Sequence, residues 1–84
     1  LKQEIRGWSA NTLNKNFQLN DNKIYLNENN KIITGTITSS LLLSSNKVIG
    51  LAMMKKNYLN QLKSFFNEEL GLIKVEKSIG SAFF

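Results

Sequence analysis

Short runs of alternating hydrophobic and polar residues, separated by polar turns, make up most of this chain. Alternation with a period of two is typical of half-buried β-strands, because successive side chains of a strand point to opposite faces. Turns rich in Asn and Asp separate the early runs, and these side chains bond readily to their own backbone. The pattern predicts a meander of short antiparallel strands. The strand-like runs are residues 17–19, 23–26, 31–38, 48–54 and 72–76.

The run at residues 31–38 is rich in β-branched residues, which pack well on a pleated sheet. We expect Ile33, Gly35 and Ile37 to share one face of this strand. A glycine inside a strand usually marks a bulge, a bend or a close approach of another backbone. Gly35 therefore predicts a local distortion, of the kind that a small, tightly curled sheet needs.

The run at residues 48–54 has no polar side chain and contains a second glycine, Gly50. A strand that is apolar on both faces is expected to be central and covered on both sides. A Ser-rich polar connection, residues 39–47, is expected to join it to the preceding strand. Because three leucines in a row are unfavourable in water, at least one residue of 41–43 should pack inward or against a missing partner domain.

The hydrophobic period changes after residue 57 and predicts one amphipathic helix over residues 58–70. Asn57 is a suitable residue to cap its start, and Gly71 is suitable to follow its end. The apolar positions that recur with helical spacing are Leu59, Leu62, Phe66 and Leu70.

These patterns together predict a mainly β fold, a small antiparallel β-barrel of five or six strands with one amphipathic helix. We expect residues 17–84 to form the barrel domain and residues 1–16 to be an N-terminal lead-in segment. Leu1, Ile5 and Trp8 are spaced as on one face of a short helix within that segment. Residues 78–81 are expected to form a turn, and the end of the chain a short apolar edge.

The composition excludes several kinds of chemistry. The 84 residues suffice for one domain and include neither Cys nor His, so disulfides, thiolate metal sites and a histidine base are excluded. No apolar run approaches the roughly 20 residues of a membrane-spanning helix. We expect a reducing compartment, the cytoplasm or, in a eukaryote, the mitochondrial matrix. Because the chain starts at Leu1 and not at Met, we expect it to be a piece of a longer protein.

The net charge of +5 has two interpretations. A basic domain can bind nucleic acid or another polyanion. Alternatively, an AT-rich genome favours Asn, Lys and Ile codons, and the scattered lysines favour this second interpretation. The six carboxylates fall in turns or on polar faces, and no phosphate-binding loop, metalloprotease or calcium-binding motif is present. The sequence therefore predicts no catalytic residue and no metal site.

Four short segments, residues 35–40, 44–45, 49–52 and 82–83, follow one another in an order that is typical of one kind of small barrel. Through these segments, residues 17–84 resemble the C-terminal barrel domain of the aminomethyltransferase superfamily. This superfamily includes the glycine-cleavage T-protein, its folate-binding iron–sulfur-maintenance relatives, and the tetrahydrofolate domains of sarcosine- and dimethylglycine-oxidising enzymes. Ser40 replaces a Gly that is usual in the T-protein and Ala82 replaces a final Pro, which favours a divergent member. The matching pieces, in order, are Gly35-Thr36-Ile37-Thr38-Ser39-Ser40, Ser44-Ser45, Ile49-Gly50-Leu51-Ala52 and Ala82-Phe83.

The resemblance implies an accessory role in tetrahydrofolate-dependent one-carbon transfer. In such proteins the folate lies mainly in a larger N-terminal part, and the barrel acts as a lid to that pocket. Tetrahydrofolate is therefore expected to bind only together with an upstream folate-binding domain or partner subunit, and this chain alone is not expected to be catalytic. The residues expected to face the ligand or the partner domain are Trp8, Thr38, Ser39, Ser40 and Leu42.

Two other classes of function remain open. The first is a non-catalytic structural subunit that docks into a larger complex through Trp8, residues 41–43 and the Phe83-Phe84 end. The second is a small basic nucleic-acid-binding barrel, which needs exposed aromatic residues on a basic face. Tyr25 is the one aromatic residue whose alternation points clearly outward. For Trp8, filling a gap in the core or an interface is favoured over binding a ligand.

Overall fold

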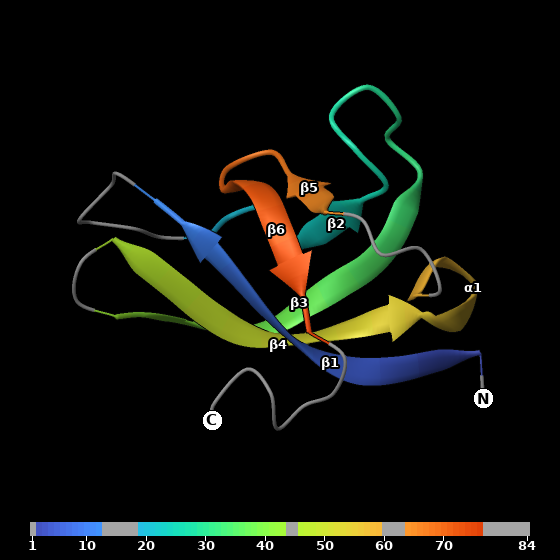
Figure 1. The fold of residues 1–84 in the computed structure, drawn as a ribbon, viewed down its shortest axis with the longest axis horizontal. Coiled ribbons are helices and arrows are strands. Elements are labelled where there is room, and N and C mark those ends of the chain that lie inside the picture. The colour runs from blue at the N-terminus through green and yellow to red at the C-terminus, as the bar shows by residue number, and fades with distance from the viewer. Residues whose placement is uncertain (1, 13–18, 44–45, 60–63, 77–84) are drawn as a thin grey trace.

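The computed structural model describes residues 2–12, 19–43, 46–59 and 64–76. In these residues the chain forms a closed barrel of six antiparallel strands and one short helix (Figure 1). Around the barrel the strands follow the order β1-β4-β3-β2-β5-β6, and β6 pairs with β1 to close it. The elements are β1 (Gln3–Asn11), β2 (Lys23–Tyr25), β3 (Ile33–Leu42), β4 (Lys47–Lys55), α1 (Lys56–Leu59), β5 (Phe65–Asn67) and β6 (Gly71–Val75). The predicted mainly β barrel is confirmed.

The strand predicted to be central is confirmed in β4, which lies between β1 and β3. It pairs with β1 over nine residue pairs, from Gln3 opposite Lys55 to Asn11 opposite Lys47. Every second residue of β4 points into the barrel, and the side chain of Met54, like that of Val48, is fully buried. Burial of this row supplies much of the hydrophobic stabilisation of the barrel.

Both glycines of the central stretch lie where another group approaches closely. A Cβ atom at Gly50 would lie 2.0 Å from the Ser39 carbonyl oxygen and 2.9 Å from Cε2 of Trp8. At Gly35 it would lie 2.4 Å from Sδ of Met54. Only glycine fits at Gly50 without a backbone shift, because the nearest atom belongs to the main chain.

Strand β3 carries two irregularities that bend it around the barrel. Its pairing with β2 skips Thr34, and its pairing with β4 skips Thr38. The first bulge places Thr34 inside, fully buried, where its hydroxyl donates to the Ile24 carbonyl oxygen over 3.1 Å. Ile33 is consequently turned outward and 36% exposed, so the expectation that it shares the inner face with Ile37 is wrong. Bulges increase twist and curvature, which a small closed barrel requires.

The barrel interior holds one cluster of apolar side chains contributed by every strand and by the turn after β5. Partly buried residues at the barrel ends, including Leu42, pack against this cluster. Its members are Trp8, Ala10, Ile24, Ile37, Val48, Ala52, Met54, Phe65, Leu70 and Ile73.

The N-terminal segment is a strand of the barrel and not a helical lead-in. Most residues of 2–12 belong to β1, which pairs with both β4 and β6. The helical spacing of Ile5 and Trp8 is misleading, because Trp8 points into the core and Ile5 outward. The domain boundary expected at residue 17 is therefore corrected, and the barrel includes the described part of residues 1–16.

The helix predicted over residues 58–70 is also corrected. The helix α1 ends at Leu59, residues 60–63 lie outside the described residues, and β5 and a three-residue turn follow. The side chain of Asn67 ends β5, because its Oδ1 accepts hydrogen bonds from the backbone N–H groups of Glu69 and Leu70. Gly71 follows that turn with φ of 75°, so its left-handed conformation serves a hairpin and not a helix end.

The remaining differences concern the boundaries of strands. The predicted polar connection over residues 39–47 is much shorter, because β3 continues to Leu42 in register with Val48. Leu42 packs against the core, as expected for one of the three leucines. Leu19 lies outside any strand, and the rest of the predicted strand at 17–19 lies outside the described residues. The predicted turn and edge at residues 78–84 lie outside them too.

Candidate functional site

Four of the five residues expected to face a ligand or a partner lie together on the last half of β3. The side chains of Thr38, Ser39 and Ser40 are exposed, while Leu42 is half-buried against the core. The Ser39 hydroxyl oxygen accepts a hydrogen bond from the Leu51 N–H over 3.2 Å, next to the bulge at Thr38. Ser39 therefore supports the distorted pairing of β3 and β4, whereas Thr38 and Ser40 present their side chains to solvent.

The fifth residue, Trp8, lies inside the barrel, and its expected contact with a partner is corrected. Its side chain is fully buried, and its indole N–H donates to the Leu51 carbonyl oxygen over 3.0 Å. A buried indole needs a partner for its N–H, and this bond supplies it. The interpretation of Trp8 as a residue that fills the core is confirmed.

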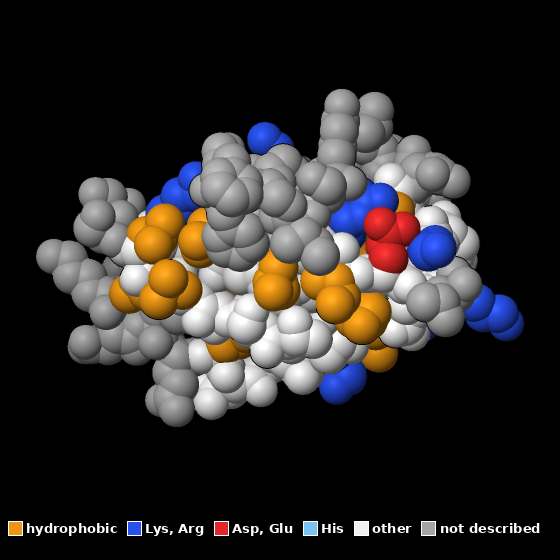
Figure 2. Space-filling view, turned by 90° about the horizontal axis from the view of Figure 1, so that it is seen from below, with side chains coloured by type: hydrophobic (Ala, Val, Ile, Leu, Met, Phe, Trp, Pro, Cys, Tyr) orange, Lys and Arg blue, Asp and Glu red, His pale blue; other side chains and the backbone are white. Residues whose placement is uncertain are grey.

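The outer side of β4 is unusually apolar for a surface strand. Ile49 is only 9% exposed, and Leu51 and Met53 are half-buried. Cross-strand neighbours extend this row, with Ile5 opposite Met53 on one side and Leu41 opposite Ile49 on the other. We call these five residues the outer apolar row. Figure 2 shows hydrophobic side chains in several groups across the face seen from below, with most basic side chains toward its edges.

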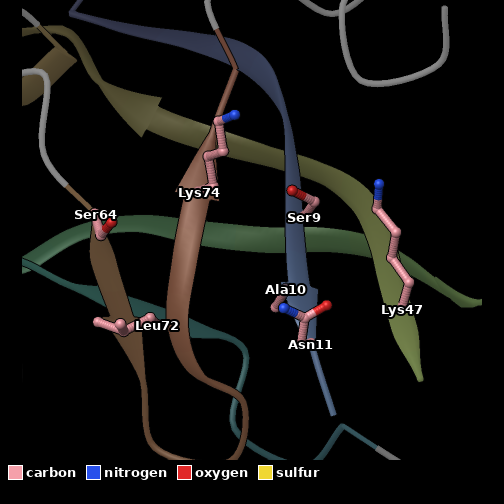
Figure 3. Close-up of a pocket in the computed structure, with 7 residues that line it drawn as sticks. All are labelled: Ser9, Ala10, Asn11, Lys47, Ser64, Leu72 and Lys74. Carbon is pink, nitrogen blue, oxygen red and sulfur yellow. The ribbon is translucent and has the colours of Figure 1, made fainter. Parts of the chain in front are cut away.

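A cleft of about 380 Å³ lies beside β1, and we call it the β1 cleft (Figure 3). Strand pairing places four of its polar residues in two opposed pairs. Ser9 lies opposite Lys74 of β6, and Asn11 lies opposite Lys47 of β4. Figure 3 shows the two lysines on either side of β1. The described lining residues are Ser9, Ala10, Asn11, Lys47, Ser64, Leu72 and Lys74.

The charged side chains that line the described part of the β1 cleft are all positive. The cleft contains two ammonium groups, and no carboxylate is among its described lining residues. The ion pairs found in the described part of the chain join Arg6 to Glu4 over 2.7 Å and Lys31 to Glu68. Lys47 and Lys74 take part in neither. The cleft is therefore suited chemically to an anionic group.

Sequence analysis missed the β1 cleft. Ser9 and Asn11 are separated by one residue on β1, a spacing that puts them on the same face of a strand. That signal was hidden, because the segment was interpreted as a lead-in with a short helix. The approach of Lys74 to Ser9 depends on a pairing between the two ends of the described chain, which local patterns do not predict.

Tyr25 has a second aromatic residue beside it, since it pairs with Phe66 of β5. The ammonium of Lys31 lies 4.3 Å from the Phe66 ring centroid and 5.4 Å from that of Tyr25, and it is also paired with Glu68. Desolvation raises the pKa of Tyr25, and the nearby Asp21 carboxylate adds to that effect. Because Lys31 already covers both rings, they do not form an open stacking platform for bases.

Among the described residues, no group of three or more His, Cys, Asp or Glu side chains could hold a metal ion. In the same residues no helix has the length and apolar character to cross a membrane.

Comparison of the chain with protein-family models, with curated proteins and with solved structures finds no match.

Proposed function

We propose that this chain is the C-terminal barrel domain of an aminomethyltransferase-like, tetrahydrofolate-dependent one-carbon transfer protein. In this proposal it is an accessory lid to a folate site that an upstream domain mostly forms. The observation that carries the proposal is the order of the family-like segments 35–40 and 49–52 on two paired neighbouring strands, β3 and β4, of a small antiparallel barrel. The resemblance implies a small β-barrel, and the observed fold supports the proposal to that extent.

The proposed surface toward the upstream domain is the outer apolar row together with the exposed end of β3. Leu41 is 59% exposed and Ile5 is 42% exposed, although both lie beside largely buried residues of β4. Contiguous apolar surface bordered by polar side chains is typical of interfaces. Thr38 and Ser40 lie on the β3 side of this surface and supply hydroxyl groups that could bond to a ligand at its edge.

The test is calorimetry with tetrahydrofolate on the 84-residue chain alone and on the longer protein that contains the upstream domain. We expect no binding by the chain alone, because half of an interdomain pocket lacks most of the contacts that hold a ligand. We expect binding by the longer protein, weakened several-fold by Leu41→Asp. The matched control is Ile32→Asp, a comparably exposed residue that precedes β3 and lies outside the outer apolar row.

Micromolar binding by the chain alone would refute the accessory role. Equal weakening by Leu41→Asp and Ile32→Asp would contradict the assignment of the surface. If neither form binds tetrahydrofolate, the proposal fails, and the same apolar surface then favours a structural subunit that docks into a larger complex.

A further inference from the structure

We propose that the β1 cleft is a binding site for a small organic molecule that carries a doubly charged anionic head, a phosphate monoester or a dicarboxylate, and an apolar body. This site goes beyond the proposed folate role and does not depend on it. It lies within this chain, on strands β1, β4 and β6, and needs no upstream domain.

The first argument is the placement of hydrogen-bond donors. In an antiparallel pair, directly opposed side chains have Cβ atoms about 4.5–5.5 Å apart. The Ser9 hydroxyl is therefore a close neighbour of Lys74, and the Asn11 amide is a close neighbour of Lys47. Hydroxyl, amide and ammonium groups can all donate to an anion. Two rigid strands hold each pair, so the four side chains line the cleft together without the ordering of a loop.

The second argument is the distribution of carboxylates. Glu4 and Glu68 are paired with Arg6 and Lys31, as described above. Glu69 accepts hydrogen bonds from the backbone N–H groups of Asn20 and Asp21. The Asp21 carboxylate accepts one from the Lys23 N–H over 3.1 Å. These four acids are engaged on other parts of the barrel. Within the described residues no ion pair joins Lys47 or Lys74 to any carboxylate, Glu28 and Glu76 included.

The third argument is the apolar side of the cleft. Leu72 is 69% exposed, the highest value among the exposed large hydrophobic residues described, and it lies on the cleft wall. A volume of about 380 Å³ is within the usual size range for small-molecule sites. An anionic head beside the lysines would place an apolar body against Leu72.

The experiment is a titration of the 84-residue protein, followed by ¹⁵N–¹H NMR, with phenyl phosphate and separately with phthalate. We expect saturable shifts at the amides of Ser9, Asn11 and Lys74, with a millimolar or tighter Kd for at least one of the two. Neutral benzamide should not produce them. Saturation by phenyl phosphate alone assigns the head to the phosphate class, and saturation by phthalate alone to the dicarboxylate class.

Substitutions test the roles of the lining residues. Lys47→Gln and Lys74→Gln should each weaken binding about threefold to tenfold, as expected for the loss of one charge-assisted contact. Lys56→Gln is the matched control, because it removes an exposed lysine that does not line the cleft. Leu72→Ser should weaken phenyl phosphate binding and leave the weaker binding of inorganic phosphate unchanged. Shifts that do not saturate, or an equal loss in Lys56→Gln, would overturn the proposal and indicate general attraction of anions by a basic protein.

Discussion

The two halves of the barrel are held together in different ways. Strands β1, β3 and β4 contain nine, ten and nine residues, whereas β2, β5 and β6 contain three, three and five. Figure 1 shows the long strands crossing the lower part of the molecule and the short strands above them. The long half has long ladders and apolar side chains on both sides of β4. The short half has too few ladder bonds to hold its strands by pairing alone.

Side chains that bond to the backbone replace ladder bonds in the short half, and Asn67 is the central example. It is fully buried, and its amide nitrogen donates to the carbonyl oxygens of Asp21 and Lys23 over 2.8 and 2.9 Å. Its amide oxygen accepts from Glu69 and Leu70 over 2.9 and 3.0 Å. One side chain thus shapes the β5–β6 turn and fastens it to the segment that enters β2. The long half therefore depends on hydrophobic packing, whereas the short half depends on a buried hydrogen-bond network.

The largest expected effect is in the long half. Trp8→Ala should cost about 3–5 kcal/mol, because it removes the largest fully buried side chain and leaves the Leu51 carbonyl without its indole donor. A loss of this size approaches the whole stability of a small domain. Urea denaturation followed by circular dichroism should show an unfolded or nearly unfolded variant. Leu41→Ala, at a residue that is 59% exposed, is the control and should shift the midpoint little.

The second effect tests the short half. Asn67→Ala should cost about 2–3 kcal/mol, because it leaves buried backbone groups without partners. Native-state hydrogen exchange should show loss of protection in β5 and β6 before loss in β4, since the network is local to the short half. Asn29→Ala, an exposed substitution in the turn after β2, is the control. Equal loss of protection in both halves would contradict the separation, and so would a cost larger than that of Trp8→Ala.

The third effect is smaller and concerns the turn that Asn67 shapes. Gly71 has φ of 75°, and a Cβ atom there would meet no atom within 4 Å. Gly71→Ala therefore introduces no clash, and its cost should be the backbone preference alone, about 1–2 kcal/mol. Gly71→Asn should recover part of this loss, because Asn adopts the left-handed conformation more readily. Thermal unfolding of the two variants checks this order, and an Ala variant as stable as the parent would contradict it.

The same difference explains how much of the fold could be predicted from sequence. In the long half, β4 was predicted with nearly correct bounds from its continuous apolar run, and residues 33–38 of β3 from their β-branched residues. β1 was not predicted as a strand, because Leu1, Ile5 and Trp8 fit a helical spacing. The short half depends on Asn67, and its role becomes visible only when Asp21 and Lys23 are known to lie beside it. Without that contact, Phe66 and Leu70 fit a helical spacing. The competing helical period was therefore preferred over a three-residue strand.

The residues of the candidate sites also differ in how far the sequence could predict their positions. Thr38 ends a predicted strand, and Ser39 and Ser40 follow it directly. Their exposure could be expected from their polarity and from the bend that Gly35 indicates. The burial of Trp8 could be expected from its size, but its inward direction depends on β1 being a strand. The β1 cleft depends on contacts between β1 and β6, which are far apart in the chain. Long-range pairing of this kind is set by closure of the whole barrel.

The smallest expected effect concerns the Glu4–Arg6 pair, where the barrel closes at the start of β1. The Arg6 Nε atom donates to the Glu4 carboxylate over 2.7 Å, and Nη1 donates to the Glu76 carbonyl oxygen over 3.1 Å. The hydrogen bond from Arg6 lowers the pKa of Glu4 from its ordinary value of 4.5.

A carboxylate whose pKa is lower in the folded state than in the unfolded state stabilises the fold at pH values above its ordinary pKa. That contribution disappears as the pH falls through the lowered pKa of the folded state. Because the Glu4 side chain keeps 39% of its surface exposed, solvent and salt should screen the pair, and the effect should be small. Urea midpoints of the parent and of Glu4→Gln, compared at pH 7 and at pH 3, should differ slightly at pH 7 and converge at pH 3. A difference that stays constant between the two pH values would show that Glu4 contributes through packing and not through its charge.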